Sequence, residues 1–470
     1  MDTEELLFAG LAGQAEMIRA GQVSARELTE ATLARITATN PALNAFRVVM
    51  ADEALAAAEA CDTARASGKE APLLGVPVAI KDEVDVAGQV TTFGGMANST
   101  PAAADAEVVR RLREAGAVII GKTCMPEFGQ WPYTESAAYG YTRNPWDLTR
   151  TPGGSSGGTA AAVASGMVAA GLGGDGGGSI RIPSACCGLF GLKPQRGRVS
   201  SAPHPDLWLA LGTAGPLTRS VRDSALFYDV IRGTVEVDAW HAEPPRMSFL
   251  DAAATPPGRL RIGYATKPAI RGVRPHPEHV EAVVRTAALL AELGHEVREV
   301  DPRYPDATAV FTPQFYGGVR AEAVEVQHPE RLERRTKQTL QLGRMVPRAT
   351  VDWATRNSER FAEKANRVFA GIDLLLTPTI AHRPRPVGAL DGAGSLTAQL
   401  RALPMIAYTA IWNVAGNPAA SVPAGFGSDG VPLAVQLVGR RHDEPTILQV
   451  AAQLETARPW AQRRPSMGAS

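Results

Sequence analysis

A segment rich in glycine and serine carries the residues most able to do chemistry. It contains Gly153-Gly-Ser-Ser-Gly-Gly158 and, 24 residues after Ser155, a second serine in Gly176-Gly-Gly-Ser-Ile-Arg181. Glycine at this density lets the backbone approach a ligand closely or adopt positive φ. Loops of this kind, held by a rigid scaffold, are where catalytic and binding residues concentrate. We therefore expect the functional site to be built around this segment.

Two nucleotide-binding hypotheses do not fit these glycines. A phosphate-binding P-loop requires a lysine directly after its second glycine, and none follows here. The stretch Gly171-Leu-Gly-Gly-Asp-Gly176 matches GxGxxG, but Ile180-Arg-Ile-Pro183 is not a typical helix start, and no acidic residue lies about 20 positions further on. Neither a mononucleotide nor a dinucleotide site is predicted.

Two catalytic hypotheses remain open from the residues alone. Gly153-Gly-Ser155-Ser-Gly157 fits the GxSxG nucleophile elbow of a Ser–His esterase, and all eight histidines lie downstream, from His204 onward. Alternatively, Lys81 closes a short apolar run, and a serine can be activated by a lysine instead of a histidine. A lysine acts as a base only when neutral, a form that burial favours.

The same blocks resemble those of the amidase signature family. The hallmark matches are Pro152-Gly-Gly-Ser-Ser-Gly-Gly158, the Gly-Gly-Ser-Ile-Arg stretch that ends at Arg181, and Pro183-Ser-Ala-Cys-Cys-Gly-Leu-Phe-Gly-Leu-Lys-Pro194. Supporting matches extend from about residue 10 to residue 456 and include Gly75–Asp82, Gly121–Thr123, Asn144–Trp146, Gly215–Arg219, Gly416–Pro418 and Gln436–Gly439.

The resemblance implies a role for each matching residue. Ser179 is the nucleophile, and Ser155, which follows a cis peptide bond, relays its proton to Lys81. Asp175 and Arg181 brace the loop. The oxyanion hole is formed by the backbone N–H groups of Gly176, Gly177, Gly178 and Ser179. The substrate pocket is bordered by Gly129, Gln130 and Trp131.

Two glycines depart from the family's pattern. Gly174 stands where Thr or Asn is common, and Gly176 where Thr, Ile, Leu or Ala is common. We therefore expect the oxyanion loop to be looser, or wider on the acyl side, than is usual. Together with the nearby Trp131 and Tyr133, this favours a bulky or aryl substrate.

The resemblance predicts a serine amidohydrolase that needs no cofactor or metal and works through an acyl-enzyme. Its expected substrates are small-molecule amides, with aryl acylamides and carbamates (urethanes) as the favoured classes. An alternative is the glutamine amidotransferase subunit of a tRNA-dependent transamidosome, which the zero net charge disfavours. Homodimers are common in the family, so the resemblance is compatible with a homodimer.

The elements that must position these residues alternate between strands and helices. Val76–Ile80 is predicted to be a buried strand that ends at Lys81, and Ala117–Ile120 another. Apolar runs at Ala420–Phe426 and Leu433–Val438 predict strands that complete the sheet begun by the N-terminal part. The expected architecture is α/β: a twisted mixed β-sheet with helices on both faces. We predict one large domain over residues 1–470, with a peripheral helical lobe at about 315–370.

Composition excludes several classes of protein. In 470 residues, Lys+Arg and Asp+Glu both total 48, so there is no basic excess of the kind that nucleic-acid binders or anionic-membrane binders carry. The four cysteines have no metal-ligand spacing and form no disulfide framework. The longest weakly apolar stretch, residues 160–172, is too short and too rich in glycine to span a bilayer. With acidic residues at the N-terminus and no secretory pattern, we expect a cytoplasmic protein.

Overall fold

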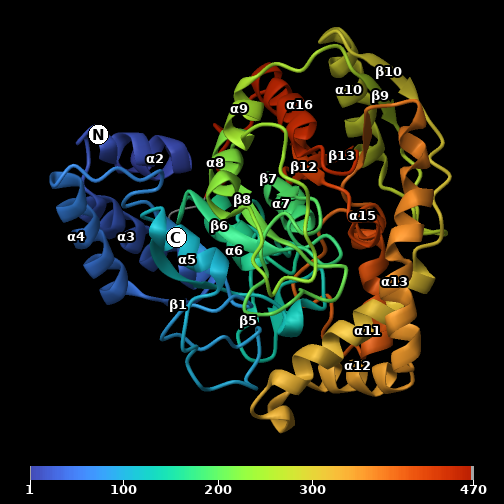
Figure 1. Cartoon of the computed structure of the whole chain (residues 1–470), viewed down its shortest axis with the longest axis horizontal. Helices are drawn as coiled ribbons and strands as arrows, with labels where there is room; N and C mark the ends of the chain where they lie inside the picture. Colours follow the sequence, from blue (N-terminus) through green and yellow to red (C-terminus); the bar gives the residue numbers. More distant parts are fainter. Residues whose placement is uncertain (1, 467–470) are drawn as a thin grey trace.

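An eleven-stranded mixed β-sheet runs through the computed structural model, which describes residues 2–466 (Figure 1). The strand order is β1-β3-β2-β6-β8-β7-β12-β13-β11-β9-β10, and β4 pairs with β5 in a separate hairpin. The C-terminal strands lie between β7 and β9, so both halves of the chain build one sheet, as predicted. The strands are β1 (Phe46–Val49), β2 (Pro77–Lys81), β3 (Val118–Thr123), β4 (Glu135–Ser136), β5 (Gly140–Tyr141), β6 (Ala170–Gly174), β7 (Phe190–Lys193), β8 (Ala214–Thr218), β9 (Arg261–Tyr264), β10 (Glu296–Glu299), β11 (Leu374–Pro378), β12 (Ala419–Phe426) and β13 (Pro432–Gly439).

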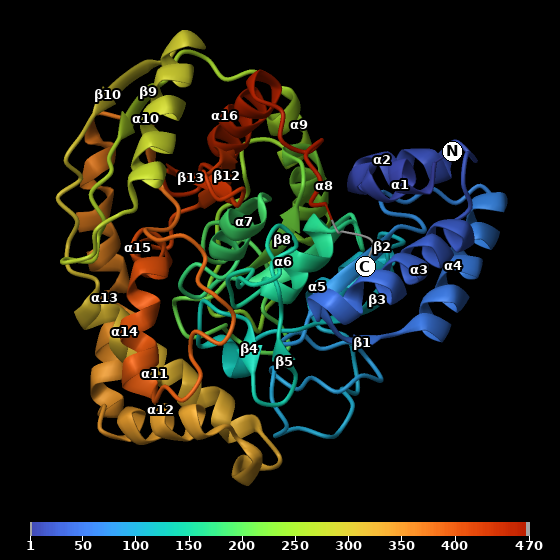
Figure 2. The same cartoon turned by 180° about the vertical axis from the view of Figure 1, so that it is seen from behind.

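Helices cover both faces of this sheet (Figures 1 and 2). α6 and α7 pack against each other, and α8, α9 and α16 form a second group. Within residues 2–466, no helix combines the length and apolar character needed to cross a membrane. The helices other than α11–α15 are α1 (Thr3–Phe8), α2 (Gly10–Arg19), α3 (Ala25–Leu43), α4 (Ala51–Ala66), α5 (Glu107–Glu114), α6 (Gly157–Ala164), α7 (Arg181–Cys187), α8 (Val221–Ile231), α9 (Phe249–Ala254), α10 (Pro277–Glu292) and α16 (Glu444–Ala457).

A group of helices projects from one side of the sheet, drawn in orange tones in Figure 1. α11 packs against both α12 and α13, and α13 packs against α15. The helical segment begins at Thr308, earlier than the predicted position near residue 315. The helices of this region are α11 (Thr308–Glu325), α12 (Arg334–Arg344), α13 (Arg348–Ala365), α14 (Ser395–Ile406) and α15 (Ala410–Ala415).

The order of the strands positions the site. β2 and β6 are parallel neighbours, with Ile80 paired to Leu172, and both strands are buried along their whole length. Parallel neighbours end at the same edge of a sheet. Lys81 is the last residue of β2, and the glycine loop that contains Ser179 leaves the end of β6 at Gly174. Residues almost one hundred positions apart are thereby brought together.

One local prediction was wrong. The segment after Ile180 was not expected to begin a helix, but α7 starts at Arg181. Pro183 lies in the first turn of α7, where backbone N–H groups have no partner within the helix. A proline is tolerated at such a position because it removes no helical hydrogen bond.

Candidate active site

Lys81 and Ser155 are joined by a buried hydrogen bond. Lys81 Nζ donates to Ser155 Oγ at 2.8 Å, and the lysine is 1% exposed. A second contact places Lys81 Nζ 2.9 Å from Glu83 Oε2, two residues further along the same chain segment. The peptide bond between Gly154 and Ser155 is cis. The structure therefore brings together the lysine and the first serine that the sequence singled out, and adds a carboxylate.

The Ser155 loop passes directly against the segment that holds Gly129 and Trp131. At Gly154, a Cβ atom would lie 2.7 Å from the backbone nitrogen of Tyr133, so only glycine allows this approach. At Gly129, a Cβ atom would lie 3.1 Å from Ser155 Oγ. The segment predicted to border the pocket thus lies directly beside Ser155.

Ser179 lies in the loop between β6 and α7 and is half-buried. The backbone N–H of Ser156 donates to the carbonyl of Ser179 at 3.3 Å, which ties the two serine loops together. The Ser179 hydroxyl makes no hydrogen bond to another residue between 2 and 466, and it lines the same cavity as Lys81 and Ser155.

The glycine loop presents three backbone donors that have no partner. Across the described part of the chain, no acceptor meets the N–H groups of Gly176, Gly177 and Ser179, and all three residues line the cavity. The N–H of Gly178 instead donates to Asp175 Oδ1 at 2.7 Å, and Gly178 does not line the cavity. Of the four expected oxyanion donors, three are therefore available.

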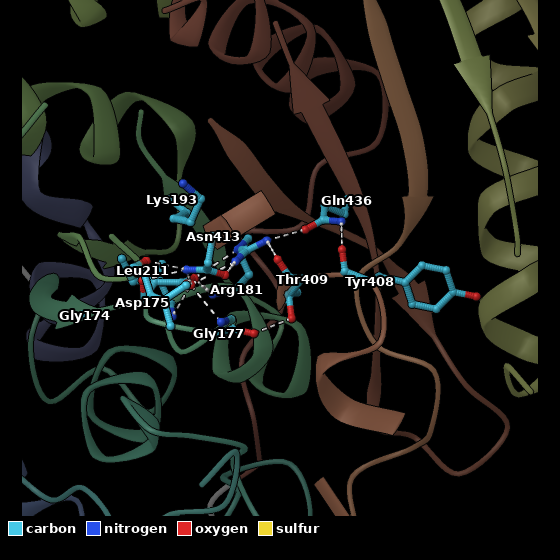
Figure 3. Close-up of polar contacts among 12 residues, drawn as sticks. Gly174, Asp175, Gly177, Arg181, Lys193, Leu211, Tyr408, Thr409, Asn413 and Gln436 are labelled. Atoms are coloured by element: carbon cyan, nitrogen blue, oxygen red, sulfur yellow. Dashed lines mark hydrogen bonds and ion pairs between the residues drawn. The ribbon is translucent and has the colours of Figure 1, made fainter. Parts of the chain in front are cut away.

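A buried ion pair anchors the glycine loop (Figure 3). Arg181 Nη2 lies 2.9 Å from Asp175 Oδ1, and both side chains are fully buried. Although burial opposes the charge, the Arg181 guanidinium lowers the pKa of Asp175 to about 2. Arg181 also donates to Asn413 Oδ1 at 2.7 Å and to Gln436 Oε1 at 2.8 Å. The expected bracing role of Asp175 and Arg181 is seen, and the loop is more firmly anchored than its glycines suggested.

The cavity in front of these residues has a volume of about 330 Å³ and largely apolar walls. A Cβ atom at Gly176 would lie 3.6 Å from the Trp208 ring, so glycine leaves open space between loop and wall. Gly129, Gln130 and Trp131 all line the cavity. The apolar wall includes Trp131, Trp208, Phe311, Phe315, Leu403 and Ile406.

The Ser–His alternative lacks its base. None of the eight histidines, all of which the structure describes, lines this cavity. Cysteine nucleophiles are disfavoured as well, because burial raises the pKa of Cys186 to about 12 and that of Cys187 well above its usual value. Between residues 2 and 466, no cluster of three His, Cys, Asp or Glu side chains is arranged to hold a metal ion.

Several residues of the site gave no signal in the sequence. Glu83 lies in the turn that follows β2 and its carboxylate reaches Lys81 Nζ, but a lone Glu indicates nothing by itself. Thr409 and Asn413 reach the glycine loop from the beginning of α15, more than two hundred residues away. Long-range contacts of this kind cannot be inferred from local spacing.

Comparisons with known proteins identify the family of the chain. The family model described as Amidase matches residues 27–448. The AmiB2 protein of Mycobacterium tuberculosis, which is named as an amidase, is 47% identical over 99% of this chain and 100% of its own length. A solved 6-aminohexanoate cyclic dimer hydrolase in complex with substrate superposes with a TM-score of 0.91 at 34% identity, covering 98% of this chain and 99% of that one. A bacterial aryl acylamidase of the amidase signature family gives a TM-score of 0.87 at 28% identity, over 96% and 97% of the two chains. The chain therefore belongs to the amidase signature family.

Proposed function

We propose that this amide hydrolase works through a triad of Ser179, Ser155 and Lys81. The observation that carries the proposal is the 2.8 Å hydrogen bond between Lys81 Nζ and Ser155 Oγ, in a cavity that Ser179 also lines. A nucleophile, a bridging hydroxyl and a buried amine in one cavity are the parts that serine activation without histidine requires.

Proton transfer begins at the lysine. In the structure Lys81 Nζ donates to Ser155 Oγ and lies 2.9 Å from Glu83 Oε2. In the neutral form that the proposal requires, the amine carries two hydrogens and one lone pair, so it can donate to Glu83 while its lone pair accepts from the Ser155 hydroxyl. Ser155 then accepts the proton of Ser179 while it gives its own proton to Lys81. The Ser179 oxygen attacks the carbonyl carbon, and the carbonyl oxygen becomes an oxyanion.

The free N–H groups of Gly176, Gly177 and Ser179 are the donors proposed to receive that oxyanion. Fixed donors in a site screened from water stabilise the developing charge by several kcal/mol, in the range of about 3–4 kcal/mol for one donor. The intermediate collapses to an acyl-enzyme, and Ser155 returns the proton to the departing amine. Water, activated by the same relay, then hydrolyses the ester on Ser179 to the acid.

The proposed substrates are bulky or aryl secondary amides, together with aryl carbamates. The aromatic side chains of Trp131, Trp208, Phe311 and Phe315 wall the cavity and match flat, apolar groups. Relatives named for an aryl acylamide and for a cyclic dimer of 6-aminohexanoate support a site that accepts more than a small primary amide.

Hydrolysis of four matched compounds tests the proposed class. A primary aliphatic amide, an acyl anilide, an aryl carbamate and glutamine are compared by kcat/KM, with Ser179→Ala as the control. We expect the anilide and the carbamate to exceed the primary amide by about 10-fold or more, the scale on which apolar pockets discriminate. Preference for the primary amide would contradict the substrate class, and preference for glutamine would favour the amidotransferase alternative.

The width of the loop is tested by Gly176→Ala. The added methyl group would meet only Trp208, at an ordinary contact distance of 3.6 Å, so the variant is expected to fold. It narrows the space between loop and wall, and we expect activity on the anilide to fall about 10-fold while activity on a small amide stays within about twofold. An equal loss on both substrates would show that Gly176 does not determine substrate size.

A further inference from the structure

The peptide group between Gly177 and Gly178 is held at both of its ends (Figure 3). Its N–H donates to Asp175 Oδ1 at 2.7 Å, and its carbonyl accepts a hydrogen bond from Thr409 Oγ1, also at 2.7 Å. The N–H groups on either side of this peptide, those of Gly177 and Ser179, have no acceptor among residues 2–466. One fixed peptide therefore separates two free donors.

The loop depends on hydrogen bonds from other segments, because its own residues have no side chains that could fix its conformation. Gly176, Gly177 and Gly178 carry no side chains, and glycine has the widest choice of backbone conformations of any residue. The two hydrogen bonds restrict the φ and ψ angles at Gly177 and Gly178. Without them these angles could change, and the flanking peptide groups that carry the free N–H groups would shift with them. Donors of an oxyanion hole are effective only when their orientation is set before the charge develops.

Thr409 is placed to give that support from outside the loop. It is fully buried, does not line the cavity, and precedes α15 at its N-cap position. Its carbonyl accepts a hydrogen bond from Arg181 Nη1 at 3.0 Å, so the ion pair that anchors Asp175 also holds Thr409 against the loop. A Cβ atom at Gly178 would clash with the Thr409 hydroxyl, so the two segments pack too closely for any side chain at this position.

We infer that Thr409 is a positioning residue for the oxyanion hole. Its hydroxyl fixes the peptide between Gly177 and Gly178, and through it the orientation of the N–H groups of Gly177 and Ser179. Ile406, Ala407, Ala410 and Ile411, on either side of Thr409, line the cavity, so the wall that contacts the substrate and the support of the oxyanion hole are one continuous segment. The inference rests on the proposed function of Ser179.

The first test compares three substitutions of Thr409. Thr409→Val keeps the shape and removes the hydroxyl, Thr409→Ala removes the hydroxyl without added bulk, and Thr409→Ser restores it. We expect kcat to fall about 10- to 100-fold in the Val and Ala variants, below the loss for deleting a donor outright, and to return to at least half of the wild-type value in the Ser variant. The matched control is Thr39→Val on α3, which removes a hydroxyl-to-carbonyl bond far from the site.

The second test separates positioning from general damage. A boronic acid that bonds to Ser179 places a tetrahedral group in the oxyanion hole, and its affinity should fall by the same factor as kcat/KM in Thr409→Val. Substrate affinity, measured in the Ser179→Ala background, should change by less than about twofold, because the ground state depends less on these donors. Equal losses in both affinities would contradict a positioning role.

The outcomes separate this inference from the proposed function. Wild-type kcat and boronate affinity in Thr409→Val or Thr409→Ala would overturn the role of Thr409, while leaving Ser179 as the nucleophile. Full activity of Ser179→Ala would instead overturn the proposed triad.

Discussion

Lys81 Nζ contacts two oxygen atoms, one on Ser155 at 2.8 Å and one on Glu83 at 2.9 Å. If the free amine is the base of the reaction, Lys81→Ala removes the group that takes the proton from Ser155. We expect kcat to fall by at least about 10³-fold, with the remaining rate supplied by binding and the oxyanion donors. Single-turnover kinetics on the anilide measures this loss.

The control for Lys81→Ala is the substitution of a histidine outside the cavity. His204 lies in a second, smaller cavity and not in the one that holds Ser179. His204→Ala should therefore keep its activity within about twofold, as expected for a residue outside the catalytic relay. Strong loss in His204→Ala together with an active Lys81→Ala would favour the Ser–His alternative.

At the scale of residues, the sequence identified the candidate catalytic side chains but not the contacts that hold the glycine loop in place. Lys81, Ser155 and Ser179 stand in motifs whose spacing can be recognised, and the structure places all three around one cavity. The hydrogen bond from the Gly178 N–H to Asp175 could not be predicted, because it depends on the backbone conformation of a loop of glycines. Thr409 was missed because its partner is distant in the chain.

At the scale of elements, the strands β2 and β3 were predicted from their residues, and β6 and β8 were not. β2 and β3 carry Val and Ile, which favour strands. β6 reads Ala-Gly-Leu-Gly-Gly and β8 contains Pro216, so their local preference is weak. These two strands form because neighbouring strands pair with them on both sides.

The junction between the short turn Glu127–Gly129 and α12 is predicted to be sensitive to pH. Glu127 is 1% exposed, and its Oε2 accepts a hydrogen bond from the backbone N–H of Glu333, the N-cap residue of α12, at 3.0 Å. Burial, reinforced by the nearby Glu333 carboxylate, raises the pKa of Glu127 to about 7. The carboxyl is therefore protonated in the folded protein at pH 5 and ionised at pH 8.

A folded-state pKa above the unfolded value gives stability that is present at low pH and lost as the pH rises through about 7. Glu127→Gln keeps the acceptor and cannot ionise. We expect the variant to exceed wild type in free energy of unfolding by about 1–3 kcal/mol at pH 8 and to match it near pH 4, below the pKa of the unfolded chain, measured by urea denaturation. Glu330→Gln, at an exposed position nearby, is the control and should show no such difference. A Glu127→Gln difference that is equal at both pH values would contradict the account.

At the scale of the whole molecule, strands from all parts of the chain build one sheet. β1 and β10 form its two edges, whereas the late strands β12 and β13 lie near its centre. Strands from the early and the late parts of the chain are neighbours in this one sheet. We therefore propose that residues 1–470 form one domain that includes the helices α11–α13. Calorimetry should show a single unfolding transition. Two separated transitions, with one assigned to α11–α13, would contradict this.

The general architecture could be predicted because strand and helix patterns alternate along the chain, and the resemblance to a family supplied the rest. The strand order could not, since parallel pairing between distant segments leaves no local trace. The homodimer and the activity on carbamates stay predictions.

Covalent labelling of Ser179 tests the central claim most directly. Wild-type enzyme is mixed with an acyl anilide or an activated aryl ester of the same acid, quenched within the first turnover, digested, and analysed by mass spectrometry. The account predicts one acyl group per chain, on the peptide that carries Ser179, and none in Ser179→Ala. An acyl group on any other residue, or turnover by Ser179→Ala at the wild-type rate, would contradict it.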